Sequence, residues 1–417
     1  VHVSASADVK LQSLLELTSS LAEALEVAEV LPPVLDSLFK IFLQADRGFI
    51  MLTNAAGKLQ VCESKFRRPQ DDTVRISRTI MQMVMDKKQA IISADAAEDS
   101  RFGLTESIAQ FQIRSFMAAP LINRDGDVLG TLQLDTLDPM REFKEKDLEI
   151  LAAITSQAAI SIQSARMHEA ALEQRAMQRD LELAQQVQMA LLPQARPEIG
   201  DYEFFDFYRA ANKIGGDYFD YVQLPDGRLA VIVADVTGHG AASALLMTKL
   251  AAEARYCLAT VERPADVVCQ LNQLLCSDGV DDRFVTMVLV VLDPATHELT
   301  IVNAGHQPPL CRQADGQLVD LSPEVSGLPL GVTDALPHDQ AAVTLEPGAS
   351  VFLWTDGITE AMNEQGEQYG NDRIRDEVAP DSSVGESSER LIESVRQFVG
   401  NSPQSDDICL VGLARKQ

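Results

Sequence analysis

The sequence is poor in basic residues. Lys and Arg total 35 against 62 Asp and Glu, so the 417 residues carry a formal net charge of −27. Such a charge repels nucleic acid and anionic lipid, and neither is expected as a partner. No stretch approaches the roughly 20 apolar residues that would cross a bilayer, and no basic segment leads into an apolar one at the N-terminus. We therefore expect a soluble, cytoplasmic protein with no nucleic-acid or membrane partner.

Cysteine is also scarce. The six cysteines include no C-x-x-C pair and no spacing typical of zinc ligands, so we expect reduced, structural thiols. Apolar residues at 46% and charged residues at 23% indicate a folded globular chain rather than a disordered one. The length exceeds the roughly 250 to 300 residues over which a single core grows, which predicts two domains. The first residue is Val1 rather than Met, so we expect a longer parent chain.

Helix and strand patterns alternate through the first part of the chain. Apolar residues recur at helical spacing over residues 8–30, and a Pro-Pro pair at 32–33 is expected to end this helix before a second begins. Two hairpins follow, with turns at 54–57 and 125–126. This order of helices and hairpins predicts an α+β domain over residues 8–165.

A long segment without glycine or proline follows, between Pro139 and Pro193. Its apolar residues keep helical spacing, which predicts one long helix. Residues 166–193 are charged and Gln-rich, as in a linker helix that pairs with a second copy. We expect a homodimer formed by a parallel coiled coil; the alternative is a helix that lies on a neighbouring domain.

Short apolar runs separated by turn residues make up the rest of the chain. Five runs are predicted strands, two stretches near 241–259 and 264–277 are predicted helices, and the Ser/Glu-rich 381–389 is expected to be a loop. This part holds 35 acids against 15 bases. The pattern predicts antiparallel sheets flanked by helices in a domain over residues 194–417.

Acidic side chains in this domain lie at strand ends or beside glycine. They are Asp217 and Asp220 in IGGDYFDYV, Asp235 in VIVADVTGHG, Asp356 in VFLWTDGITEA, and Asp406 with Asp407 in SDDICLVGL. A carboxylate at the end of a buried strand is costly without a cation, and Lys and Arg are scarce nearby. Acids that met at one point would repel one another unless a hard cation such as Mg²⁺ or Mn²⁺ bound between them. The pattern therefore predicts a metal site.

Glycines accompany these acids. Because glycine lacks a Cβ, it would let the backbone turn sharply and approach an ion or a phosphate closely. The glycines in question are Gly215, Gly216, Gly238, Gly240 and Gly357.

The segments GGDYFD, ADVTGHG, NAGHQPPL, GLPLGV, TDGITEA and SDDIC occur in an order that resembles one known family. These are the PPM-type, metal-dependent Ser/Thr protein phosphatases, in the bacterial branch that regulates sigma factors. The resemblance covers roughly residues 190–415. It implies an α/β/β/α sandwich that binds two Mn²⁺ or Mg²⁺ ions and hydrolyses phosphoserine or phosphothreonine. The implied substrate is a phosphorylated protein of the anti-sigma-factor antagonist type.

The resemblance also implies roles for individual residues. Asp217 and Asp235 would bind the metal pair, with Asp235 bridging the ions and the backbone carbonyl of Val236 assisting. Asp356 and Asp406 would complete the ligand set. Two neighbouring acids stay open as alternative ligands: Asp220 and Asp407.

Basic and imidazole side chains near these motifs have two interpretations each. Arg209 and Lys213 precede the GGD segment and would orient the phosphate, or are ordinary exposed cations beside a strand. His239 and His306 would be general acids, although a hydrogen-bonded structural role in a Gly-rich turn is the preferred interpretation.

The N-terminal part resembles GAF sensor domains over about residues 10–165, through the segments ADRGFIML, IRSFMAAPL and VLGTLQLD and the enclosing helices. The signature of cyclic-nucleotide-binding members is absent, and Cys62 lacks the context of a bilin-attachment cysteine. Neither ligand is expected, and whether this domain binds another ligand is left open. Three residues would line a pocket or are ordinary core and surface residues: Arg101, Phe102 and Phe111.

Together the two parts predict a phosphatase regulated through its GAF domain and linker helix. The alternative is a catalytically inactive, phosphatase-like scaffold that binds a phosphoprotein, although the complete acid set argues against it. A nucleotide cyclase is a third interpretation, but the purine-selecting Lys and transition-state Arg that it needs are not evident.

Overall fold

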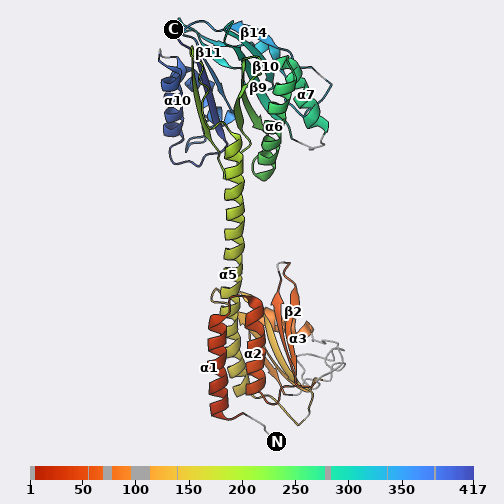
Figure 1. Cartoon of the computed structure of the whole chain (residues 1–417). Helices are drawn as coiled ribbons and strands as arrows, with labels where there is room; N and C mark the ends of the chain where they lie inside the picture. The colour runs from red at the N-terminus through yellow and green to blue at the C-terminus, as the bar shows by residue number, and fades with distance from the viewer. Residues whose placement is uncertain are drawn as a thin grey trace. The chain divides into compact units, whose positions relative to one another are not determined.

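The computed structural model describes residues 5–54, 56–68, 78–94, 113–138, 140–277, 283–335, 337–379 and 382–417. The chain divides into two compact units, Val1–Met177 and Gln178–Gln417 (Figure 1). Among the helices of the described ranges, none combines the length and the apolar character needed to cross a bilayer. All six cysteines lie in the described ranges and are free thiols. Three residues considered above as pocket-lining lie outside the described residues: Arg101, Phe102 and Phe111.

The N-terminal unit is built on a five-stranded antiparallel sheet in the order β2-β1-β5-β4-β3. Its strands are β1 (Arg47–Thr53), β2 (Leu59–Phe66), β3 (Ile91–Ser93), β4 (Ser115–Ile122) and β5 (Val128–Thr136). Its described residues also form the helices α1 (Ala7–Glu23), α2 (Val27–Ile41), α3 (Arg78–Lys87) and the first part of α5 (Glu145–Leu191). Both predicted hairpins, β1–β2 and β4–β5, are confirmed, as is the α+β class.

The two faces of this sheet bury different side chains, because successive residues of a strand alternate between faces. On β5, Leu132 and Leu134 share a core with residues of α1, α2 and α5. Thr131 and Gln133 lie on the opposite face, and both are fully buried. Helices α1, α2 and α5 therefore cover one face of the sheet, and α3 packs on the other, where an apolar cluster lies beside the buried polar groups.

The helix boundary near the prolines differs from the prediction. Pro32 and Pro33 lie inside α2 instead of ending the helix before it. The start of α2 is fixed by Glu29, whose carboxylate accepts hydrogen bonds from the backbone N–H groups of Leu25 at 2.9 Å and Glu26 at 3.4 Å. Such a capping box pairs N–H groups that a helix start leaves without partners. The cap thus sets the boundary ahead of the prolines.

The C-terminal unit contains two sheets. The first has the order β13-β10-β9-β8-β7, with β14 also paired to β10, and the second has the order β12-β11-β15-β16-β6. The strands of the first are β7 (Tyr218–Gln223), β8 (Leu229–Val236), β9 (Val285–Asp293), β10 (Glu298–Ala304), β13 (Ser326–Gly327) and β14 (Ala341–Thr344). Those of the second are β6 (Tyr202–Arg209), β11 (Leu310–Arg312), β12 (Leu318–Asp320), β15 (Ser350–Trp354) and β16 (Ile408–Arg415).

Helices cover the outer face of each sheet. Contacts join α6 and α7 to the first sheet, and α10 to β6 and β16 of the second. The helices are α6 (Ala241–Thr260), α7 (Pro264–Ser277), α8 (Asp356–Thr359), α9 (Gly370–Val378) and α10 (Val384–Val399). One apolar cluster lies between the two sheets and beneath α6 and α7, with residues of β8, β9, β15 and β16. A second cluster lies between the second sheet and α10. Burial of each such aliphatic side chain contributes about 1.5–3 kcal/mol. The expected α/β/β/α sandwich is confirmed.

The Ser/Glu-rich segment was wrongly predicted to be a loop, because it contains the start of α10. The Ser383 hydroxyl accepts from the N–H of Glu386, and the Glu386 carboxylate accepts from the N–H of Ser383, both at 3.1 Å. This reciprocal pair is the S-x-x-E capping box, a sequence signal for a helix start.

Candidate metal centre and active site

Four of the acids lie at one end of the sandwich. Asp217 immediately precedes β7 and Asp235 lies near the end of its antiparallel partner β8. In the other sheet, Asp356 follows β15 and Asp406 precedes β16, which are likewise antiparallel. Strand reversal places the members of each pair at the same end of their sheet, so each sheet supplies two acids.

Thr355 joins the two sheets at this point. Its hydroxyl donates a hydrogen bond to the Asp217 carboxylate at 2.5 Å and accepts one from the Cys409 backbone N–H at 3.0 Å. Thr355 occupies the N-cap position of α8, yet its side chain does not cap the helix. A threonine before a helix normally indicates capping, so sequence reasoning gave no reason to assign it to the site.

Burial and mutual repulsion raise the pKa of these carboxyl groups. The pKa of Asp235 rises to about 7 because the group is buried and because Asp356 and Asp406 lie nearby. The pKa of Asp356 rises to about 6, through burial and then the charge of Asp406. Burial also raises the pKa of Asp406, and burial together with Asp235 raises that of Asp217 well above its usual value. The four groups therefore lie close enough to repel one another.

A positive charge is missing from this group. In the part of the chain that the structure describes, none of the four acids forms an ion pair with Lys or Arg. Within the same residues, no three His, Cys, Asp or Glu side chains are arranged to hold a metal ion. Carboxylates that meet in this way must either retain protons, as the raised pKa values indicate for the metal-free site, or bind a cation. The donor set of carboxylates fits Mg²⁺ or Mn²⁺, which prefer oxygen ligands.

The Val236 carbonyl oxygen, next in the chain to Asp235, is a further potential metal ligand. A Cβ on Gly216 would lie 2.9 Å from this oxygen, a separation that real Cβ atoms almost never show. Glycine at this position lets the loop before β7 approach the end of β8. Glycine was expected to let the backbone approach an ion or a phosphate. At Gly216 the close neighbour is instead a backbone oxygen, that of Val236.

Asp407 holds the loop that carries Asp217. Its carboxylate accepts hydrogen bonds from the backbone N–H groups of Gly216 at 2.5 Å, Ala211 at 2.8 Å and Asp217 at 3.4 Å. The residue is only 7% exposed, so these bonds replace solvent. Both carboxylate oxygens are used by backbone groups, which distinguishes Asp407 from its neighbour Asp406.

The structure does not bring Asp220 to the other acids. Its carboxylate accepts from Arg255 Nε at 2.6 Å and Nη2 at 3.1 Å, and from the Tyr218 hydroxyl at 2.6 Å. Asp220 lies three positions after Asp217, so their side chains point to opposite faces of the sheet. Asp220 thus faces α6, which carries Arg255, while Asp217 faces the second sheet.

His306 is buried with both ring nitrogens occupied. Nδ1 lies 2.8 Å from the Thr286 hydroxyl, and Nε2 lies 3.0 Å from the Trp354 carbonyl oxygen. Because a carbonyl can only accept, Nε2 carries the proton and Nδ1 accepts from the hydroxyl. Burial lowers the pKa of His306 to about 4, so the ring is neutral at neutral pH. These contacts favour the structural interpretation. His239 is exposed, and its charge lowers the pKa of Asp406, so it lies near that acid.

The two basic residues before GGD have other contacts. Lys213 Nζ lies 3.5 Å from a carboxylate oxygen of Glu182 on α5, and both side chains are about half exposed. The Arg209 guanidinium lies over the Phe207 ring, 6.0 Å from its centroid.

The last turns of α5 also hold the loop before β7. The Gln188 side chain accepts from the Gly215 N–H at 3.0 Å and donates to the Gly215 carbonyl at 2.6 Å. Gln188 is 4% exposed, so this reciprocal pair is shielded from water. Gly215 precedes Asp217 by two residues, and the helix therefore contacts the backbone that positions a site acid. The Gln-rich composition of the linker indicated pairing with a second copy, and it gave no signal for this contact.

A buried polar group lies in the N-terminal unit, on the sheet face away from α2. Arg47 Nε donates to Asp135 at 2.6 Å, and the Gln133 amide donates to the same carboxylate at 2.9 Å. Burial raises the pKa of Asp135, although Arg47 opposes this effect. Among the described residues, Arg47 Nη2 and Gln133 Oε1 have no hydrogen-bond partner.

Known proteins resemble both units. Residues 26–162 match the model of the GAF domain, and residues 225–416 match that of Stage II sporulation protein E (SpoIIE). Phosphoserine phosphatase RsbP of Bacillus subtilis (strain 168) is 27% identical over 238 residues, 56% of this chain and 57% of that protein. Phosphoserine phosphatase RsbU of the same organism is 28% identical over 194 residues, 46% of this chain and 57% of that protein.

The chain therefore spans 57% of the length of each of these two relatives. Among solved structures, the SiaA-PP2C domain of Pseudomonas aeruginosa matches with a TM-score of 0.52 and 23% identity. The match covers 58% of this chain and 98% of that one, and it shows a shared fold.

Proposed function

We propose that this chain, in which a GAF domain precedes a SpoIIE-type phosphatase domain, is a metal-dependent Ser/Thr protein phosphatase. The observation that carries the proposal is the group formed by Asp217, Asp235, Asp356 and Asp406. These acids have raised pKa values and no Lys or Arg ion pair among the described residues. The reaction is hydrolysis of phosphoserine or phosphothreonine.

These four acids and the Val236 carbonyl are the proposed ligands of two Mn²⁺ or Mg²⁺ ions. Bound divalent ions would lower the pKa of a water molecule and neutralise phosphate oxygens. Thr355 would orient Asp217 through its 2.5 Å hydrogen bond. Asp407, an alternative ligand by sequence, is assigned instead to holding the loop before β7.

Asp220 is assigned to stabilising the contact between β7 and α6. Its carboxylate is 1% exposed and has the Arg255 guanidinium as counter-ion. To bind a metal ion, Asp220 would have to give up its ion pair with Arg255, and breaking a buried ion pair is strongly unfavourable.

The proposed substrate is a phosphorylated protein of the anti-sigma-factor antagonist type. The names of the two curated relatives support phosphoserine as the hydrolysed group. The order of the sequence motifs in the C-terminal domain supports an anti-sigma-factor antagonist as the substrate, since these motifs resemble the sigma-factor-regulating branch of the phosphatases.

Regulation is proposed to run through the GAF domain and α5. The pairing of Gln188 with Gly215 supports this idea, because movement of the helix would displace the loop that carries Asp217. A homodimer is proposed to form through the same helix. Its exposed apolar side chains support that pairing: Met167, Leu172, Met177, Leu183 and Val187. Sedimentation equilibrium of the full chain would test the dimer; a monomer at micromolar concentration would contradict it.

Hydrolysis of p-nitrophenyl phosphate by the full chain, with and without Mn²⁺, tests the proposed activity. Asp235→Asn should abolish turnover while leaving the fold intact, since the carboxamide is a weaker metal ligand. Asp220→Glu, which keeps the counter-ion of Arg255, is the matched control and should stay active. A wild-type protein that binds Mn²⁺ but does not turn over would favour the inactive scaffold, and an active D235N variant would refute the site assignment.

A further inference from the structure

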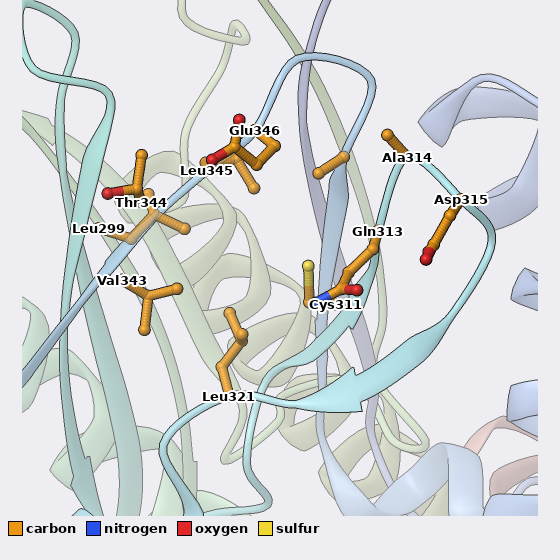
Figure 2. Close-up of a pocket in the computed structure, with 11 residues that line it drawn as sticks. Leu299, Cys311, Gln313, Ala314, Asp315, Leu321, Val343, Thr344, Leu345 and Glu346 are labelled. Atoms are coloured by element: carbon orange, nitrogen blue, oxygen red, sulfur yellow. The ribbon is translucent and has the colours of Figure 1, made fainter.

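A pocket of about 300 Å³ opens between the two sheets of the C-terminal unit (Figure 2). It is lined from β10, β11 and β14, from the β11–β12 turn and from the segment before β15. Ala349, immediately before β15, lies in the pocket wall, whereas the site acid Asp356 follows the end of that strand. Five residues of strand span about 16 Å, so the pocket lies at the end of the sandwich away from the acids.

The floor of the pocket is apolar. Figure 2 shows these side chains around a common space: Leu299, Cys311, Leu321, Val343 and Leu345. Four of the five are buried, so they belong to the interior of the domain. Native interiors contain few voids larger than a water molecule, and small-molecule sites begin at roughly 300 Å³. The space is therefore large for a packing defect.

The rim of the pocket is negatively charged. Asp315 and Glu346 contribute carboxylates, and no Lys or Arg is among the described lining residues. The Asp315 carboxylate accepts one hydrogen bond, from the Gln317 N–H at 2.9 Å, and the structure assigns Glu346 no ion pair in the described ranges. Both residues are exposed at the mouth. An apolar floor below two carboxylates complements a molecule with an apolar body and a cationic end.

We propose that this pocket binds a small amphipathic amine, with its apolar body among Leu299, Leu321 and Leu345 and its ammonium group beside Asp315 and Glu346. A cavity of roughly 150 Å³ accommodates benzene, so twice that volume has room for one ring and a short alkylamine chain. The site draws residues from both sheets. Occupancy therefore stabilises the sandwich, whether or not the domain is a phosphatase.

The probe is 2-phenylethylamine, with 3-phenylpropionate as a control of similar size and opposite charge. For a ligand of this size we expect a Kd on the order of 1 mM. Two readouts on the full chain locate the binding. At about ten times the Kd, the amine should slow alkylation of Cys311 by N-ethylmaleimide about tenfold, while exposed Cys62 reacts at an unchanged rate. It should also raise the urea midpoint reported by Trp354, the only tryptophan of the chain.

Charge variants test the chemistry of the ligand. Asp315→Asn with Glu346→Gln should weaken amine binding about tenfold and remove the preference over 3-phenylpropionate. The matched control, Asp334→Asn with Asp339→Asn, removes the same charge from exposed residues outside the pocket and should leave the Kd unchanged.

A blocking variant tests the location independently. Ala314→Phe places a ring at the exposed rim, keeps Trp354 as the only tryptophan and should abolish the midpoint shift, whereas Gln317→Phe on the same turn should not. The proposal is overturned if the amine neither protects Cys311 nor raises the midpoint at about ten times the expected Kd. Equal binding of the carboxylate, or unchanged binding by the D315N/E346Q or A314F variants, would also overturn it.

Discussion

Asp406 and Asp407 are adjacent in sequence, yet the structure predicts opposite effects when each is replaced by asparagine. Asp407 accepts buried backbone N–H groups at 2.5 and 2.8 Å, from Gly216 and Ala211. In Asp407→Asn, the single amide oxygen can accept one of them and the NH₂ group faces the other. A lost charge-assisted bond to a buried donor costs about 1.5–3 kcal/mol, so we expect a total loss of about 2–4 kcal/mol.

Asp406→Asn should leave the metal-free protein as stable as the wild type or more stable. Asp406 accepts the N–H of Asp407 at 2.8 Å, and an asparagine oxygen can keep this bond. The substitution also removes a carboxylate whose pKa is raised by burial, and thus part of the repulsion among the acids. Phosphatase activity should nevertheless be lost, because a proposed metal ligand is gone.

Urea unfolding in EDTA measures this difference. Trp354 is the only tryptophan, lies in β15 and is 5% exposed, so its fluorescence follows the C-terminal unit within the full chain. With a slope of about 2 kcal/mol per molar urea, D407N should unfold about 1–2 M earlier than wild type, and D406N no earlier. The assignment of the two acids is refuted if D406N is the less stable variant or if D407N unfolds with the wild type.

Three further outcomes are expected. The folded-state pKa values of Asp235 (about 7) and Asp356 (about 6) lie above the usual value of 3.8, so the folded state holds more protons and metal-free stability should fall as the pH rises from about 4 to above 7. Saturating Mn²⁺ should reduce that fall in a urea midpoint series, and a metal-free midpoint that rises with pH would contradict the raised values. Gln188→Ala should lower the rate about tenfold at limiting Mn²⁺ and less at saturating Mn²⁺, whereas Gln186→Ala, at an exposed position, should have no effect in the same assay. Thr355→Val should weaken Mn²⁺ binding about tenfold in calorimetry and Thr355→Ser should restore it; equal affinities would remove Thr355 from the site.

Central strands were predictable from sequence, and edge strands were not. β8, β9, β15 and β16 are nearly continuous apolar runs because they are covered on both faces. β6 and β7 lie at the edges of the two sheets and are partly exposed. Their mixed polar composition follows from that exposure, and it removes the apolar signal on which a strand prediction depends.

The candidate site could be predicted as a set of acids but not as a geometry. Strand ends and neighbouring glycines marked Asp217, Asp235, Asp356 and Asp406 as candidates. The sequence could not separate Asp220 from them, because its partner Arg255 lies 35 residues away on another element. The contacts of Gln188 and Thr355 likewise join segments distant in the chain, and only the folded arrangement brings those groups together.

The division of the acids between two sheets has a consequence for the empty and loaded forms of the domain. Each sheet contributes two carboxylates, so ions bound by all four would link the two sheets at this end of the sandwich. Chelation of the ions would remove this link and leave the hydrogen bond from Thr355 to Asp217 as a remaining connection between the sheets there. Amide hydrogen exchange would then become faster in β7 and β15 near the acids, while strands far from the acids would keep their protection.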